Sequence, residues 1–166
     1  GYAMPVQYAR GIIAEHKWTR ENAGLFDVSH MGQAWVIGPD HATTAAAIET
    51  LVPGDVAGLQ PGAIRYTQFL TDEGGIIDDL MITRPSDPAL DGRLFVVVNA
   101  ARKDVDYAHM RARLPGSITL EPIGDRALLA LQGPKAENVM GRHCGIAVDV
   151  AFMTAAGAGC GGAACA

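Results

Sequence analysis

Cysteine is scarce in this 166-residue chain and confined to its C-terminal end. Residues 1–143 contain none, and Cys144, Cys160 and Cys165 form no C-x-x-C pair and have no suitably spaced histidine partners. A zinc site is therefore not expected. A disulfide framework is not expected either, which is typical of proteins from the cytosol or an organelle matrix.

Positive charge is also in short supply. The chain has 13 Lys and Arg residues against 18 Asp and Glu residues, and so a formal net charge of −5. Such a chain lacks the basic patch that proteins use against nucleic-acid phosphates, so we expect no nucleic-acid partner. No apolar run approaches the roughly 18 residues that a membrane-spanning helix needs, so we expect no membrane partner.

The signatures of common nucleotide-binding and hydrolase sites are missing as well. No G-x-G-x-x-G segment opens a helix, and no G-x-x-x-x-G-K-[ST] loop or G-x-S-x-G elbow occurs anywhere in the chain. Nucleotide binding through glycine-rich phosphate loops is therefore not supported, and neither is a hydrolase built on a nucleophile elbow.

The chain does contain enough apolar material for a folded core. Hydrophobic residues make up 49% and charged residues 19%, and this length fits one domain or at most two small ones. Apolar periodicity and Gly/Pro breaks predict both helices and strands. The helices are expected over 11–23, 41–52 (capped by Asp40), 101–114 and 135–142, and the strands over 33–37, 66–71, 76–83, 94–98, 117–120 and 127–131.

The clearest local signal is a β-hairpin. Two β-favouring apolar runs flank the segment D-E-G-G at residues 72–75, and glycine supplies the positive φ that a tight turn needs. Helices and strands mix along the chain without an internal repeat or a recognisable linker. The sequence therefore predicts an α+β fold with mixed or antiparallel sheets and packed helices.

The last twelve residues differ in composition from the rest. Residues 155–166 contain only Ala, Gly and Cys, which offer little surface to bury. We expect this tail to be disordered or to be read out of frame.

Two adjacent carboxylates, Asp78 and Asp79, lie within an apolar strand. Neighbouring side chains of a strand point to opposite faces, so one aspartate should face the interior or a cleft and the other the solvent. An inward carboxylate needs a partner or a ligand, which makes a role in proton handling one interpretation. The other is that one Asp ends the hairpin and its neighbour binds a backbone amide.

Several other polar residues have two interpretations each. Asp27, Ser29 and His30 resemble the composition of a catalytic triad, but successive residues of an extended segment do not converge, so bonds to nearby backbone are favoured. Asn99 follows a buried strand, where it either presents its amide to a ligand or caps the next helix, the cap being favoured by position. Tyr66 is either a core residue or a stacking wall, with core favoured.

Five short motifs follow one another along the chain. They are G-Y-A-M-P-V-Q-Y (1–8), G-L-F-D-V-S-H-M-G (24–32), G-G-I-I-D-D-L (74–80), V-V-N-A (97–100) and L-Q-G-P (131–134). Each motif alone is weak. In this order they resemble the aminomethyltransferase, or T-protein, of the glycine cleavage system, and the resemblance runs from residue 1 to about residue 154.

The resemblance implies a fold, a reaction and partners. It implies that residues 1–154 are the N-terminal part of a folate-binding region. A T-protein takes the aminomethyl group carried on the lipoyl arm of the H-protein and transfers its methylene to tetrahydrofolate, the co-substrate, with release of ammonia. The compartment implied is the cytoplasm of a bacterium, or the mitochondrial matrix of a eukaryote.

The resemblance also implies a site. The functional aspartate of the family falls on the second Asp of G-G-I-I-D-D-L, which is Asp79, and it handles the pterin nitrogens during methylene transfer. Met31, Tyr66 and Asn99 fall on further residues of the folate pocket. Thr83 stands where other members often have an aromatic residue.

The chain departs from the family in length. T-proteins are more than twice as long, and their later R-x-G-Y-T-G-E-D motif is absent here. The resemblance therefore implies an N-terminal fragment, from a truncated or frameshifted gene, that is inactive on its own. Two alternatives remain: the folate-binding domain of a sarcosine or dimethylglycine oxidase, which an upstream flavin domain would favour, and a non-catalytic folate-binding module.

Overall fold

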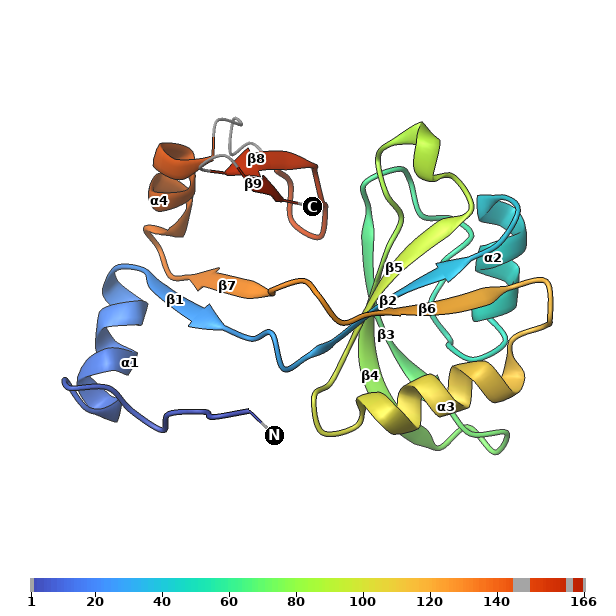
Figure 1. Ribbon diagram of the computed structural model, residues 1–166, viewed down its shortest axis with the longest axis horizontal. Coiled ribbons are helices and arrows are strands. Elements are labelled where there is room, and N and C mark those ends of the chain that lie inside the picture. Colours follow the sequence, from blue (N-terminus) through green and yellow to red (C-terminus); the bar gives the residue numbers. More distant parts are fainter. Residues whose placement is uncertain (1, 145–149, 161–162, 166) are drawn as a thin grey trace. The chain divides into compact units, whose positions relative to one another are not determined.

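The computed structural model describes residues 2–144, 150–160 and 163–165 (Figure 1). It divides the chain into two compact units. The unit that we call the sheet unit comprises Met31–Arg126 and Val150–Ala156, and the terminal unit comprises Gly1–His30, Ala127–Asp149 and Gly157–Ala166. The chain passes from one unit to the other and back, so no single linker marks the boundary in the sequence.

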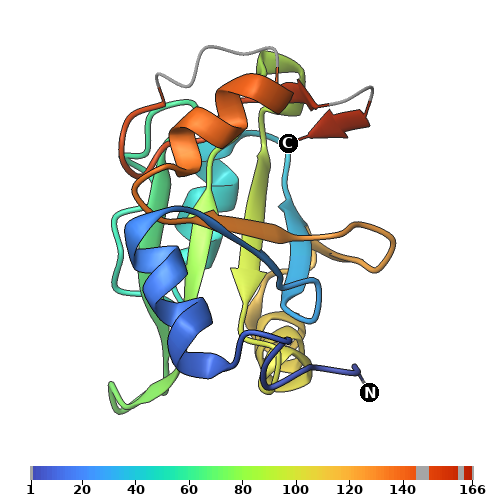
Figure 2. The same ribbon diagram turned by 90° about the vertical axis from the view of Figure 1, so that its left-hand side faces the viewer.

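The sheet unit is built on five antiparallel strands in the order β3-β4-β5-β2-β6. Two helices, α2 and α3, lie on one side of this sheet (Figure 2). The elements are β2 (Gly32–Ile37), α2 (His41–Ile48), β3 (Ile64–Leu70), β4 (Ile76–Thr83), the short 3₁₀ helix η1 (Pro88–Leu90), β5 (Arg93–Val98), α3 (Lys103–Arg113) and β6 (Thr119–Ile123).

The hydrophobic core lies between this sheet and its two helices. Alternate strand residues are buried there, and together with α2 and α3 they form one cluster, as expected for strands with one face against helices. We call this side of the sheet the helix face and the opposite side the second face. The buried hydrophobic strand residues of the helix face are Ala34, Val36, Phe69, Leu80, Ile82, Leu94, Val96 and Val98.

The predicted hairpin is confirmed as strands β3 and β4. Gly74 has a φ of +81° in its turn, and its N–H donates to the Thr71 carbonyl at 3.0 Å. The pairing changes register between Phe69 and Leu70. This bulge adds one residue to β4 just before Asp78, and such bulges re-aim the side chains that follow them.

Two further elements depart from the predicted bounds for physical reasons. Helix α2 is capped as predicted, since the Asp40 carboxylate accepts a bond from the Thr43 N–H at 2.7 Å, but it ends at Ile48. Strand β6 continues through Pro122, which pairs with Ala34. The prediction ended this strand before the proline, but β6 is an edge strand, where a missing N–H costs no ladder bond.

Helix α3 buries the side that carries its largest apolar residues, Tyr107 and Met110. Val105 is exposed. Asp106, Tyr107 and Met110 are buried instead. Tyr107 and Met110 contribute a large apolar surface, and its burial sets the orientation of the helix.

The terminal unit consists of short elements with little buried surface. Strands β1 and β7 pair antiparallel, as do β8 and β9, and neither α1 nor α4 has a buried residue. The elements are α1 (Ile12–Glu21), β1 (Gly24–Asp27), β7 (Leu129–Gln132), α4 (Ala136–His143), β8 (Ala158–Cys160) and β9 (Ala163–Cys165).

Gly133 of the L-Q-G-P motif lies where two backbones of the terminal unit approach closely. Its φ is +117°, and a Cβ there would lie 2.4 Å from the Thr19 carbonyl oxygen and 2.5 Å from that of Asn22. Lys135 N–H also donates to the Asn22 carbonyl at 2.9 Å. A side chain at residue 133 would separate these segments, so glycine is required.

Two results bear on the ends of the chain. Cys144 is disulfide-bonded, a bond that the sequence analysis, which expected no disulfide framework, did not predict. The predicted tail, 155–166, lies partly outside the described residues, and its disorder stays a prediction. In the described part of the chain, no helix is long and apolar enough to cross a membrane.

Candidate functional site

Three of the predicted site residues form one hydrogen-bonded group in the sheet unit. The Tyr66 hydroxyl donates to Asp79 Oδ2 at 2.5 Å. The Asn99 side-chain amide donates to Asp79 Oδ1 at 2.6 Å and lies 3.3 Å from the Asp79 carbonyl oxygen. Each oxygen of the Asp79 carboxylate therefore has its own donor, and the two donors fix its orientation.

Strand register explains why these residues meet. Leu80 pairs with Val98 across β4 and β5, so Asp79 and Asn99 are the next residues at the end of that ladder. Asp79 itself pairs with Gln68 on β3, and Tyr66 is the next residue along β3 on the same face. The group thus joins β3, β4 and the end of β5 on the second face.

The electrostatics of the group favour an ionised aspartate beside a neutral tyrosine. The Tyr66 hydrogen bond, followed by that of Asn99, holds the pKa of Asp79 below its ordinary value, although burial acts in the opposite direction. The same hydrogen bond to Asp79 raises the pKa of the Tyr66 hydroxyl. At neutral pH Asp79 is therefore a carboxylate held by two neutral donors.

Asp78, one residue earlier, belongs to the helix face. Its Oδ1 accepts from the Asn99 amide at 3.1 Å, and its side chain is a neighbour of Asp106 on α3, whose pKa it helps to raise. The alternation predicted for the two aspartates is confirmed by this arrangement, since Leu80 and Ile82, which share the parity of Asp78, are buried.

Met31, the fourth predicted site residue, lies just before β2. Gly32 pairs with Val98, so Met31 lies at the register level of Asn99, at the same end of the sheet. All four predicted residues are thus at this end or on this face, and three of them are directly connected.

Two interpretations based on position alone are wrong. Tyr66 is not a core residue, since it is 55% exposed, and its ring remains available on the second face. Asn99 is not a helix cap: α3 begins with Arg102 in the cap position, without a side-chain cap bond. Both side chains are instead held by hydrogen bonds to Asp79. Average burial of a residue type and helix-capping preference do not take such a partner into account.

Asp27, Ser29 and His30 do not assemble into a triad. The Asp27 carboxylate accepts from the backbone N–H of Ser29 at 2.9 Å, and the Ser29 hydroxyl accepts from the N–H of Leu128 at 3.0 Å. His30 instead makes an edge contact with the ring of Tyr2, 6.1 Å between centroids. The favoured interpretation, that these three side chains bind nearby backbone, is confirmed for Asp27 and Ser29.

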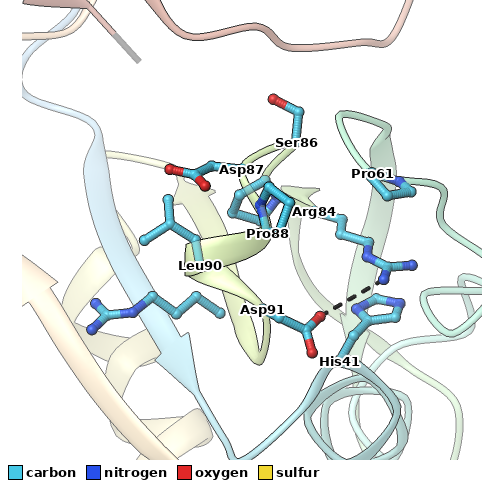
Figure 3. A pocket seen from close by; sticks show the side chains of 10 residues that line it. His41, Pro61, Arg84, Ser86, Asp87, Pro88, Leu90 and Asp91 are labelled. Carbon is cyan, nitrogen blue, oxygen red and sulfur yellow. Dashed lines mark ion pairs between the residues drawn. The ribbon is translucent and has the colours of Figure 1, made fainter.

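Two cavities of the chain are lined by residues outside the Tyr66–Asp79–Asn99 group. A cavity of about 330 Å³ in the sheet unit lies beside η1 (Figure 3). Its Arg84 guanidinium lies 3.8 Å from the Asp91 carboxylate and donates to the Leu59 carbonyl, so its charge is already compensated. A cavity of about 800 Å³ in the terminal unit is lined by the first motif and by residues 15–30.

Sequence reasoning missed Asp106, which the structure places beside Asp78. It is fully buried, and burial, followed by the charge of Asp78, raises its pKa to about 7. The signal was present in the spacing of Tyr107 and Met110, because residues on their side of the helix must face the sheet. Among the described residues, no group of three or more His, Cys, Asp or Glu side chains could hold a metal ion.

Comparison with known proteins identifies the family of the chain and its fold. The family model of the GCVT N-terminal domain matches residues 1–166. This chain belongs to the GCVT N-terminal domain family. The α+β fold is confirmed by a crystal structure of the glycine cleavage system aminomethyltransferase T from Bartonella henselae, which matches with a TM-score of 0.82 at 36% identity over 93% of this chain.

Curated relatives of the chain are named aminomethyltransferases. The chain is 46% identical over 142 residues to an aminomethyltransferase of Desulfitobacterium hafniense, and 36% identical over 148 residues to a mitochondrial aminomethyltransferase of Dictyostelium discoideum. Each match covers 84% of this chain. The chain spans 37% of the Desulfitobacterium protein and 40% of the Bartonella chain, so it corresponds to the N-terminal part of these aminomethyltransferases.

Proposed function

We propose that this chain supplies the pterin-binding part of an aminomethyltransferase of the glycine cleavage system. The reaction transfers the methylene of an aminomethyl group from the lipoyl arm of the H-protein to tetrahydrofolate. The bonds from this carbon to sulfur and to nitrogen break, two bonds to folate nitrogens form, and ammonia and the dithiol arm are released. The observation that carries the proposal is the Tyr66–Asp79–Asn99 group in a chain of this family.

The Asp79 carboxylate fits the needs of a reduced pterin. It is ionised at neutral pH, and two donors fix its position before any ligand arrives. A carboxylate held in this way accepts a hydrogen bond from a ring N–H, takes up a proton there, and stabilises positive charge that develops on the transferred carbon. Because its orientation is already fixed, little reorganisation is needed during reaction.

The neighbouring residues provide the apolar part of such a site. The exposed Tyr66 ring offers a flat surface for a pterin ring, and its hydroxyl remains bonded to Asp79. The Asn99 amide fixes Asp79 from the β5 side. Met31, at the same level of the sheet, adds an adaptable and polarizable side chain.

The division at residue 154 and the compartment also remain proposals. Residues 1–154 would form the folate-binding region, and 155–166 a tail outside it. The curated relatives include bacterial and mitochondrial proteins, and the proposed reaction belongs in the cytoplasm or the mitochondrial matrix accordingly.

A graft tests the proposal directly. Residues 2–154 would replace the structurally equivalent segment of the Bartonella aminomethyltransferase, which the chain matches over 40% of its length. Turnover would be measured with aminomethylated H-protein and tetrahydrofolate. We expect activity that is abolished by Asp79→Asn. A graft that folds cooperatively and binds tetrahydrofolate equally well with and without Asp79→Asn, at unchanged turnover, would contradict the assignment.

A further inference from the structure

Three buried carboxylate oxygens in the sheet unit have no hydrogen-bond donor among the described residues. They are Asp78 Oδ2 and both oxygens of Asp106, and Asp106 is fully buried. Asp78 and Asp106 are nevertheless side-chain neighbours, since the charge of Asp78 and a hydrogen bond between the two side chains contribute, after burial, to the raised pKa of Asp106. Two ionised carboxylates are acceptors only, so the two side chains form this hydrogen bond only when one of them carries a proton.

The surroundings of Asp78 and Asp106 favour a state in which the two carboxyl groups together carry one proton over a state in which both are ionised. Two ionised carboxylates that are neighbours away from water repel each other. Such a pair therefore keeps one proton up to a pH well above the ordinary pKa of an aspartate. The charges that face Asp106 are those of Asp78 and Asp79 on β4 and of Arg102 before α3. Burial and the two aspartates favour the protonated form of Asp106, and Arg102 alone opposes them.

The pair is linked to the candidate site through one amide group. Asn99 Nδ2 donates to Asp78 Oδ1 at 3.1 Å and to Asp79 Oδ1 at 2.6 Å. Any change in the charge of Asp78 therefore changes the competition for this donor. A fully ionised pair would draw the amide toward Asp78 and away from Asp79.

We propose that Asp78 and Asp106 share one proton across the sheet–helix contact, and that this protonated pair positions the Asn99 amide against Asp79. Asp106 is thus a positioning residue that acts through Asp78 and Asn99. The role of Asp106 in catalysis rests on the proposed function of Asp79. The shared proton does not depend on that function.

The pH dependence of unfolding tests the shared proton in the chain itself. An acid whose pKa is raised on folding stabilises the folded state at low pH, and this stability is lost as the pH rises from the unfolded pKa to the folded one. Asp106→Asn places an N–H donor where the proton would be and cannot titrate. Relative to this variant, we expect the folding constant of the unsubstituted chain to fall roughly tenfold per pH unit between about pH 5 and pH 7.

His109 provides an internal check on the sign. It also lies on α3, where its ring contacts that of Phe69 at 5.5 Å, and burial, followed by Arg113, lowers its pKa. A histidine with a lowered pKa gives stability that increases as the pH rises toward the unfolded value, which is the opposite slope. The slope assigned to Asp106 should therefore persist in His109→Gln.

Asp78→Asn is the second variant, and it also replaces one carboxyl of the pair by an amide. Asp78→Asn and Asp106→Asn should each remove the same pH slope, and the double variant should remove no more. Parallel pH profiles for the unsubstituted chain and both single variants would overturn the shared proton.

The position of Asn99 is read separately, from its side-chain amide signals in NMR spectra. We expect these signals to shift near pH 7 in the unsubstituted chain, to stay in place in Asp106→Asn, and to move at every pH in Asp106→Ala. A pH-independent Asn99 amide in the unsubstituted chain would overturn the positioning role. Neither measurement uses folate, so a failed tetrahydrofolate assay with intact pH behaviour would count against the proposed function alone.

Discussion

The two faces of the five-stranded sheet shift the pKa of aspartate side chains in opposite directions. On the second face, Asp79 has neutral donors on both oxygens and a lowered pKa. On the helix face, Asp78 meets a second carboxylate, and the pKa of that partner, Asp106, is raised to about 7. Two adjacent residues of one strand therefore differ: Asp79 is an anion of fixed orientation, whereas Asp78 belongs to a pair of carboxyl groups that keeps a proton. The difference shows that neighbours and burial decide what a carboxylate can do, and that residue type alone does not.

The largest expected effect contrasts the same substitution on the two sides of the sheet. Met110 of α3 is fully buried against the helix face, whereas Met81 on the second face is 39% exposed. Met110→Ala should lower the free energy of unfolding by about 3 kcal/mol, because it removes buried surface and leaves a cavity. Met81→Ala should cost less than about 1 kcal/mol. Urea unfolding of both variants measures this, and equal losses would show that the second face is also a core surface.

The next effect separates the adjacent aspartates by their activity. In the active graft, Asp79→Asn keeps the shape of the side chain but removes its charge and basicity, so kcat should fall by ~10²-fold or more. Asp78→Asn keeps an oxygen for the Asn99 amide and should cost less than about tenfold. Steady-state kinetics at matched folding measures both. A larger loss for Asp78→Asn would reverse the assignment of the two faces.

A smaller effect on activity is expected when Asp79 loses the hydrogen bond from the Tyr66 hydroxyl. Tyr66→Phe keeps the ring but removes this donor, so the pKa of Asp79 should rise toward its ordinary value and kcat/KM for tetrahydrofolate should fall by about fivefold. The matched control is Tyr107→Phe, whose hydroxyl donates to the Gln33 carbonyl at 3.0 Å. The control should lose about 1 kcal/mol of stability and keep its kinetics. Equal kinetic losses in both variants would mean that the Tyr66 hydroxyl has no special role.

The smallest effect concerns an exposed ion pair at the far end of the hairpin. Arg113 of α3 binds both carboxylate oxygens of Asp72, one of them at 3.1 Å. Both side chains are largely in contact with solvent. Asp72→Asn should therefore change the free energy of unfolding by less than about 1 kcal/mol, and less again at high salt. Thermal unfolding at low and high salt measures this, and a loss like that of Met110→Ala would contradict it.

Much of the sheet unit was predictable from the sequence, because its signals are local. The turn at Gly74, the Asp40 cap and the opposite facing of Asp78 and Asp79 each depend on residues that are neighbours in the chain. The family resemblance added Tyr66, Asn99 and Met31 as site residues. Position alone assigned Tyr66 to the core and Asn99 to a helix cap, and both assignments were wrong.

The rest depends on contacts between distant segments, which local patterns do not contain. Asp106 meets Asp78 only because α3 packs with Tyr107 and Met110 against the sheet. Strand β6 passes through Pro122 only because it lies at an edge. The two-unit division was missed because residues 1–30 pair with a segment around residue 130, so neither unit is continuous in the sequence.

The contrast between the two faces is tested most directly by a site-resolved NMR titration of the side-chain carboxyl carbons. The account predicts that Asp79 titrates below the ordinary value of 3.8 and that Asp106 titrates near 7. The second transition should disappear in Asp106→Asn, while the first remains. Titration of both carboxyl groups in the ordinary range, or in the reverse order, would contradict the account.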